Sequence, residues 1–135
     1  MSQTLRSLRA LADPTRIRLL ALLDRAELSV NELQEITGLG QSRISTHLRL
    51  LQEADFLGSR RDGKRTYYCI NEACRRGEGG LLTLAFQGAE EIEEHRADEM
   101  NLKRILARRE DQAQVYFNQV AGRFDRSYGP GRSPT

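Results

Sequence analysis

The chain has 135 residues and a mass of 15.4 kDa, which allows one ordinary domain, or a small domain with an appendage, and excludes two full α/β enzyme domains. Hydrophobic residues make up 39% of the chain, no apolar run is long enough to cross a membrane, and the N-terminus lacks the apolar segment of a signal peptide, so we expect a cytoplasmic protein without a membrane partner. The net charge is only +2, from 21 basic and 19 acidic residues, so the total charge does not indicate a nucleic-acid partner.

Two helices are predicted at the start of the chain. Leucines at helical spacing predict the first over Gln3–Ala12. Asp13 is a good N-cap residue and Pro14 suits the first helical position, because the N–H that proline lacks has no partner there. We therefore expect a second helix from Pro14. One of two sets of its side chains faces inward: Ile17, Leu20 and Leu23, or Leu19 and Leu22.

A third and a fourth helix follow at short spacing. Ser29 and Glu32 form the capping-box pattern, so we expect a short helix over Val30–Thr37, with Gly38 as its C-terminal stop. The fourth helix begins near Gln41. Its apolar stripe is Ile44, Leu48 and Leu51, and the rest of its circumference is polar.

A β-hairpin is predicted after the fourth helix. Leu57–Arg61 and Lys64–Ile70 have the composition of strands, and the Asp62-Gly63 dipeptide between them suits a two-residue turn. Its basic tip consists of Arg60, Arg61, Lys64 and Arg65.

The remaining sequence indicates a long helical stretch and a mobile end. A glycine-rich break over Gly77–Gly80 precedes it, and Ser127–Thr135 contains the glycines and prolines of a mobile tail. Basic residues are in excess between Gly40 and Tyr67 and acidic ones between Gly88 and Glu99, so the two regions have different neighbours. The apolar seam that we expect to form a dimer contact is Leu81, Leu84, Ala85 and Ile92.

The third and fourth helices, joined by Gly38-Leu39-Gly40, have the pattern of a helix-turn-helix. Small polar and basic side chains at the start of the fourth helix could reach base edges in a major groove about 12 Å wide. The alternative is an ordinary surface helix, but the basic hairpin tip next to it favours a DNA backbone as neighbour. His47 is either a DNA contact or a structural histidine. The predicted DNA-binding residues are Gln41, Ser42, Arg43, Ser45, Thr46, His47, Arg49, Arg60, Arg61, Lys64 and Arg65.

Four stretches in order, Leu11–Leu20, Glu27–Leu33, Gln41–Leu51 and Arg60–Tyr68, carry a family resemblance. Through them the chain, from about residue 5 to residue 71, resembles the ArsR/SmtB family of winged-helix transcriptional regulators. The resemblance implies a mainly α fold with a small β-hairpin, a winged helix-turn-helix with a long C-terminal dimerisation helix. It implies a homodimeric repressor that reads a pseudo-palindromic operator in double-stranded DNA and is released by an effector.

Members of this family commonly sense metals, and two metal sites known in the family can be compared with this chain. Where the family's thiol site has Cys-Val-Cys, this chain has Ser29-Val30-Asn31, so that site is absent. Glu91, His95 and Glu99 fall four residues apart on one expected helix face and are weak candidates for a divalent ion. We favour an ordinary solvated acidic face and predict no metal and no cofactor.

The two cysteines, Cys69 and Cys74, are too few for a disulfide framework, which agrees with a reducing compartment. Each is either a small buried hydrophobe, which we favour, or part of a redox or arsenite sensor. Arg75 and Arg76 beside Cys74 favour a reactive thiol.

Residues Ala107–Ser133 resemble the linker of regulators of this family that are fused to a class I methyltransferase domain. That resemblance implies an S-adenosyl metabolite as effector; a thiol-reactive agent and a metal are the other candidates. The alternative function is a regulatory fragment of an S-adenosylmethionine-dependent methyltransferase fusion. No catalytic residue set is present, so we predict no enzyme activity. We divide the chain into a DNA-binding domain (1–77), dimerisation helices (78–110), and a C-terminal helix with flexible tail (111–135).

Overall fold

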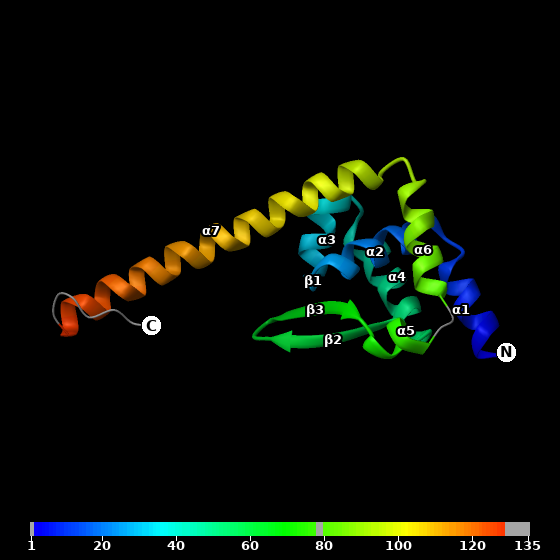
Figure 1. The fold of residues 1–135 in the computed structure, drawn as a ribbon, viewed down its shortest axis with the longest axis horizontal. Helices are drawn as coiled ribbons and strands as arrows, with labels where there is room; N and C mark the ends of the chain where they lie inside the picture. The colour runs from blue at the N-terminus through cyan, green and yellow to red at the C-terminus, as the bar shows by residue number, and fades with distance from the viewer. Residues whose placement is uncertain (1, 78–79, 129–135) are drawn as a thin grey trace. The chain divides into compact units, whose positions relative to one another are not determined.

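The fold is mainly helical with one small antiparallel sheet, as predicted, in a computed structural model that describes residues 2–77 and 80–128 (Figure 1). The predicted mobile tail therefore falls largely outside the described residues, as do positions 78 and 79 of the glycine-rich break. The helices are α1 (Gln3–Leu11), α2 (Pro14–Arg25), α3 (Val30–Thr37), α4 (Gln41–Glu53), α5 (Glu72–Gly77), α6 (Leu81–Glu90) and α7 (His95–Tyr128), and the strands are β1 (Leu28–Ser29), β2 (Leu57–Asp62) and β3 (Arg65–Ile70).

The chain divides into two units, Met1–Leu102 and Lys103–Thr135. The first contains α1 to α6, the sheet and the first two turns of α7. The described part of the second is the continuation of α7 to Tyr128, a helix of 34 residues in all. None of the helices in the described part of the chain combines the length and apolar character needed to cross a membrane.

The predicted helix caps of the first unit are confirmed. The Asp13 carboxylate accepts hydrogen bonds from the backbone N–H groups of Thr15 (2.8 Å) and Arg16 (3.1 Å), and Pro14 is the first residue of α2. Ser29 and Glu32 form the full capping box of α3. Gly38 ends α3 with φ of +77°, a left-handed conformation that a side chain would strain.

The sheet has one more strand than predicted. The order is β1-β3-β2, because Leu28 and Ser29 pair with Tyr68 and Tyr67 on the free edge of β3. Two residues are too few to produce an alternating pattern, so this strand leaves no signal in the sequence.

The predicted hairpin turn was one residue out of register. Asp62 pairs with Arg65, so the two loop residues are Gly63 and Lys64. Gly63 has φ of +64° while Lys64 does not have a positive φ, which is the φ pattern of a type II′ turn with glycine at its first loop position. Asp62 therefore ends β2.

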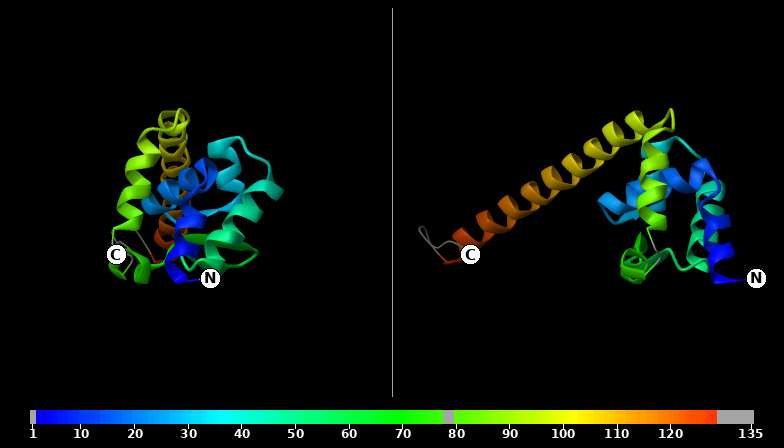
Figure 2. Two further views of the ribbon diagram at one scale, coloured as in Figure 1. Left: turned by 90° about the vertical axis from the view of Figure 1, so that its right-hand side faces the viewer. Right: turned by 45° about the vertical axis from the view of Figure 1, so that its right-hand side comes forward.

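The core of the first unit surrounds α2, which in the left view of Figure 2 lies between α4 on one side and α6 on the other. Both inward-facing sets proposed for α2 contribute to it, since the helix is covered on more than one side. Ile17 alone is only half-buried. The fully or nearly fully buried side chains include Leu19, Leu20, Leu22, Leu23, Leu28, Leu33, Ile36, Ile44, Leu48, Leu51, Phe56 and Ile70.

The expected long helical stretch after residue 80 is two helices. Glu91 caps the C-terminus of α6, and α7 starts only at His95. Ile92 lies in the connection, with its N–H bonded to the carbonyl of Ala89, so it is not part of a helical seam. The helix period of the apolar residues continues across a turn of four residues, and this is why the sequence pattern did not reveal the break.

Candidate nucleic-acid interface

Helix α4 has one buried side and one open side. Ile44, Leu48 and Leu51 are at most 1% exposed and fix the helix on the core. The open side, which we call the α4 outer face, consists of the exposed Gln41, Ser42, Arg43, Thr46 and Arg49. Ser45 and His47 are half-buried at its margins. The structure thus places five of the seven predicted α4 residues together on solvent-exposed surface.

The N-terminus of α4 is open as well. Its cap residue is Gly40, which has no side chain that could accept a hydrogen bond from the first turn. The first N–H groups of a helix have no partner within the helix, and the helix dipole gives them a partial positive charge. This end of α4 is therefore suited to a phosphate.

Arg43 and Thr46 have local partners that limit their motion without burying them. The Arg43 guanidinium donates a 3.3 Å hydrogen bond to the hydroxyl of Thr15 at the start of α2. The Thr46 hydroxyl donates to the carbonyl of Ser42, one turn earlier, at 2.9 Å. Arg49 forms an exposed ion pair with Glu53 at 3.3 Å, and such pairs contribute little to stability.

His47 is held from below by Arg16, a residue that sequence reasoning did not single out. Nη1 of Arg16 lies 3.3 Å from Nδ1 of His47. Because a guanidinium can only donate, Nδ1 must accept, which leaves the proton of a neutral ring on Nε2. Burial lowers the pKa of His47, and the nearby charges of Arg16 and Arg43 lower it further, against the opposite effect of Asp13. The histidine is thus a structural partner of α2 that also keeps one N–H free to donate.

Arg16 also joins α1 to this arrangement. Its Nε donates to the carbonyl of Ala10 at 2.7 Å and its Nη2 to the carbonyl of Arg9 at 3.2 Å. One side chain therefore satisfies the open C-terminal end of α1 and orients His47 on α4. The signal was present in the sequence, since Arg16 lies inside the first of the four stretches that carry the family resemblance.

The basic residues of the hairpin fall into two groups. Arg60 forms two hydrogen bonds with the carboxylate of Glu27 (3.0 and 3.1 Å) and stacks 5.0 Å from the centre of the Tyr67 ring. The bond to Glu27 raises the pKa of Arg60. This arginine is therefore committed to its own chain, and its predicted role toward DNA stays a prediction.

Arg61, Lys64 and Arg65 make up the second group. All three are exposed at the end of the hairpin, around the Gly63-Lys64 loop. Within the residues that the structure describes, no ion pair or hydrogen bond occupies their side chains. They are free to meet an external anion.

A second surface of opposite character lies across α1 and α6, which run side by side in Figures 1 and 2. Leu5, Leu8 and Leu84 are 56%, 45% and 63% exposed. Leu8 and Leu84 belong to an apolar groove of about 210 Å³, which we call the α1/α6 groove. It is lined from α1 and its C-cap, α2 and α6 by Leu8, Leu11, Ala12, Ile17, Leu81, Leu84 and Ala85. Three of the four predicted dimer residues line it; the fourth, Ile92, does not.

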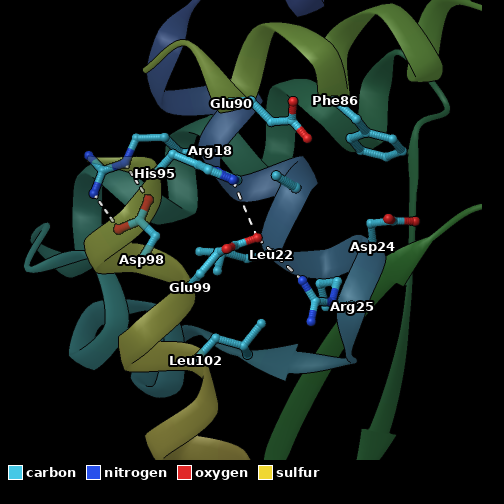
Figure 3. A pocket seen from close by; sticks show the side chains of 11 residues that line it. Arg18, Leu22, Asp24, Arg25, Phe86, Glu90, His95, Asp98, Glu99 and Leu102 are labelled. Carbon is cyan, nitrogen blue, oxygen red and sulfur yellow. Dashed lines mark hydrogen bonds and ion pairs between the residues drawn. The ribbon is translucent and has the colours of Figure 1, made fainter. Parts of the chain in front are cut away.

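The candidate metal residues are not arranged as expected. Glu91 belongs to the end of α6 and His95 starts α7, so the expected single helix face with Glu91, His95 and Glu99 is wrong. His95 and Glu99 do lie one turn apart on α7, with Nε2 and Oε1 3.3 Å apart (Figure 3). Over residues 2–77 and 80–128, no three His, Cys, Asp or Glu side chains gather as metal ligands do.

The two cysteines have different surroundings. Cys69 is half-buried on β3 and Cys74 is 7% exposed within α5. The Cys74 thiol donates a hydrogen bond to the carbonyl of Asp55. A thiol donor in a buried site fits a structural role, and the sensor role of the pair stays a prediction.

Comparison with known proteins gives a family and a fold. A family model described as "Bacterial regulatory protein, arsR family" matches residues 13–59. The "Transcriptional repressor SdpR" of Bacillus subtilis is 32% identical over 63 residues, which are 47% of this chain and 70% of that protein. The "Probable mercury resistance operon repressor" of Streptomyces lividans is 42% identical over 69 residues, which are 51% of this chain and 55% of that protein.

Among solved structures, the homodimeric winged helix-turn-helix DNA-binding domain of Mb0332 from Mycobacterium bovis is 33% identical, with a TM-score of 0.56. The similarity covers 69% of this chain and 83% of that one, a fragment described as "a possible ArsR-family transcriptional regulator". The chain spans little more than half the length of the curated repressors it matches first, at 55% to 58%. Residues 13–59, which the family model matches, include α2, α3 and α4.

Proposed function

Because this chain belongs to the ArsR family of bacterial regulatory proteins, we propose that it is a sequence-specific DNA-binding repressor that acts as a homodimer and is released from its operator by an effector. The family is one of regulators, which favours this function over catalysis. The observation that carries the proposal is the α4 outer face: a helix fixed on the core by three buried aliphatic side chains, with five polar and basic side chains exposed on its other side.

In this proposal α4 enters the major groove with its N-terminal half. Arg43 is then the principal reader of base edges, since a guanidinium pairs in bidentate fashion with guanine. Its bond to the Thr15 hydroxyl is long, at 3.3 Å, and has an uncharged acceptor, so it can exchange for a base. Arg61, Lys64 and Arg65 contact the phosphate backbone, because all three lie at the exposed hairpin end.

The α1/α6 groove is the surface that we propose for the second subunit. Leu8 and Leu84 expose apolar surface that would be buried in a dimer, at roughly 25 cal/mol for each Å² removed from water. Two copies of α4 related by a two-fold axis read two half-sites, typically about 34 Å apart or a multiple of that distance. The homodimeric Mb0332 domain supports this arrangement.

The test is binding to a labelled duplex from the region upstream of the protein's own gene, compared with a scrambled duplex of equal length. We expect Arg43→Ala to cost about 1–3 kcal/mol of binding free energy and to reduce the preference for the specific duplex. The matched control is Arg96→Ala, which removes an exposed arginine of α7 away from both surfaces and should leave the affinity unchanged. Equal losses in the two variants would contradict the proposal.

The effector is open in this proposal. Burial of the Cys74 thiol disfavours a thiol-reactive agent. A divalent ion bound by Glu91, His95 and Glu99 is disfavoured because Glu91 caps α6 whereas His95 begins α7. The relatives named above are repressors and regulators. The similarity of Ala107–Ser133 to a methyltransferase linker, and with it an S-adenosyl effector, stays a prediction.

A further inference from the structure

A cavity of about 160 Å³ lies between α2, the end of α6 and the first turns of α7 (Figure 3). It is large enough for a small molecule rather than for a single water. Phe86, Leu22 and Leu102 give it apolar walls, and charged side chains from the three helices surround the rest. Every lining residue precedes Lys103, so the cavity belongs entirely to the first unit.

The cavity is separate from the two surfaces described above. Phe86 and Glu90 are four residues apart and lie on one side of α6. Leu81, Leu84 and Ala85, which line the α1/α6 groove, lie on the opposite side of the same helix. A second subunit in that groove would therefore leave the cavity open to a ligand.

Most of the charges around the cavity are already paired. Arg18 and Asp98 form a buried bidentate pair at 2.8 and 2.9 Å. Glu99 lies 3.4 Å from Arg25 and 3.3 Å from His95, as the dashed lines of Figure 3 show, and Asp24 bonds Arg75 at 2.7 Å.

Glu90 is different. In the described part of the chain its carboxylate makes no ion pair and no hydrogen bond, and Figure 3 shows it beside Phe86 at the edge of the cavity. The lining carboxylates, Asp24, Glu90, Asp98 and Glu99, outnumber the two lining guanidiniums, Arg18 and Arg25. Because Asp24, Asp98 and Glu99 have cationic partners, the negative charge left over at the cavity is that of the exposed Glu90, next to the Phe86 ring.

We propose that this cavity binds a small organic cation, a primary ammonium or guanidinium compound with a short apolar portion. The cationic group would meet Glu90, whose carboxylate accepts charge-assisted hydrogen bonds. The apolar portion would pack on Phe86 and Leu102, and the ring of Phe86 attracts a cation placed over its face. A carboxylate ligand is disfavoured, because both arginines already have acidic partners.

The cavity wall also connects to the helix-turn-helix. Arg18, whose partner Asp98 lines the cavity, donates from Nη2 to the carbonyl of Thr37 at 3.4 Å. One turn further along α7, Asn101 donates to the carbonyl of Ile36 at 2.9 Å. Both carbonyls belong to the last turn of α3, directly before the Gly38-Leu39-Gly40 turn into α4. A ligand that shifts α7 against α2 would therefore move the end of α3, and this regulatory part rests on the proposed DNA-binding function.

The binding itself is tested without DNA, by recording backbone amide NMR spectra of the full chain during titration with n-butylammonium chloride. We expect saturable shifts at the lining residues of α2, α6 and α7. Sodium butyrate at equal ionic strength should produce none. In Glu90→Gln the affinity for n-butylammonium should fall about tenfold, since a hydrogen bond to a charged group is lost. Glu91→Gln removes the same charge from the neighbouring residue, outside the cavity, and should leave the affinity unchanged.

Equal shifts with butyrate, equal losses in the two variants, or shifts located away from these helices would overturn the binding site. The regulatory part has its own readout: saturating n-butylammonium should weaken specific DNA binding about fivefold or more in the native chain and not in Glu90→Gln. Binding in the cavity without any change in DNA affinity would overturn the regulatory part. A chain that binds no DNA would contradict the proposed function and leave the NMR result standing.

Discussion

The α4 outer face and the α1/α6 groove lie over the same core yet offer opposite chemistry. Ile44, Leu48 and Leu51 fix α4 on that core, and Leu82, Ala85 and Ala89 fix α6. On the outside, α4 exposes Arg43, Thr46 and Arg49, whereas α1 and α6 expose Leu8 and Leu84. A polar and basic helix face suits the edges and phosphates of a duplex, while an exposed apolar groove suits another protein chain. The difference supports the two partners that we propose, DNA for the α4 outer face and a second subunit for the α1/α6 groove.

The largest effect is expected on the stability of the fold, at the buried Arg18–Asp98 pair. Its side chains are 8% and 5% exposed, so removing one partner leaves a buried charge uncompensated. We expect Asp98→Ala to lower the free energy of unfolding by about 3–5 kcal/mol, measured by urea denaturation at fixed protein concentration. The control is the double change Arg18→Met with Asp98→Leu, which removes both charges and should cost much less. A loss of under about 1 kcal/mol in Asp98→Ala would mean that the pair is not buried in solution.

The role of the α1/α6 groove is tested by changing Leu8→Glu together with Leu84→Glu. Charges placed in the α1/α6 groove should convert the dimer to a monomer, seen by sedimentation. Specific DNA affinity should fall about 100-fold or more, because one module makes only half of the contacts. Thr83→Glu adds a charge at an exposed position of α6 outside the groove and should change neither property. A dimer that survives the double change would place the contact elsewhere.

The contact of the hairpin with DNA is tested by Lys64→Ala in the hairpin loop. Lys64 is exposed and, among the described residues, has no ion pair, so we assign it a phosphate contact. Its loss should weaken binding to specific and scrambled duplexes alike and reduce the slope of log affinity against log salt by about 1. Glu53→Gln is a useful comparison, because it changes an exposed charge on α4 whose partner is Arg49. An unchanged slope in Lys64→Ala would exclude the contact.

The smallest expected effect concerns pH. Burial lowers the pKa of His47 below its ordinary value of 6.5. The unfolded chain therefore takes up the proton first, and the stability that His47 contributes is present above about pH 6.5 and is lost as the pH falls toward the folded-state pKa. The loss is small, because water still screens a half-buried ring.

The measurement is an NMR titration of the ring signals, assigned with His95→Gln. The His47 signal should titrate with a midpoint below 6.5. A midpoint above that value would contradict the Arg16–His47 hydrogen bond, in which Nδ1 must be unprotonated.

The capped helices were predictable because each carries a local signal. Asp13-Pro14, the Ser29–Glu32 box and Gly38 act within three or four residues, so their effects are visible in the sequence itself. The same holds for the α4 outer face, since a helix fixed by Ile44, Leu48 and Leu51 can expose only the remaining side.

The features that the sequence did not reveal depend on contacts between distant residues. Strand β1 exists because Leu28 pairs with Tyr68 across the sheet. Arg18 is buried because it pairs with Asp98, a residue 80 positions later in the sequence. The pairing of Arg60 with Glu27 is of the same kind. The helix break at Glu91 was hidden for a different reason: the helix period of the apolar residues continues across the turn.

The central claim is that the α4 outer face touches the operator while α6 does not. A photo-reactive amino acid at position 46, in the complex with specific duplex, tests it directly against the same group at position 83 on α6. The account predicts cross-links to DNA from position 46 and none from position 83. Cross-links from position 83, with none from position 46, would contradict it.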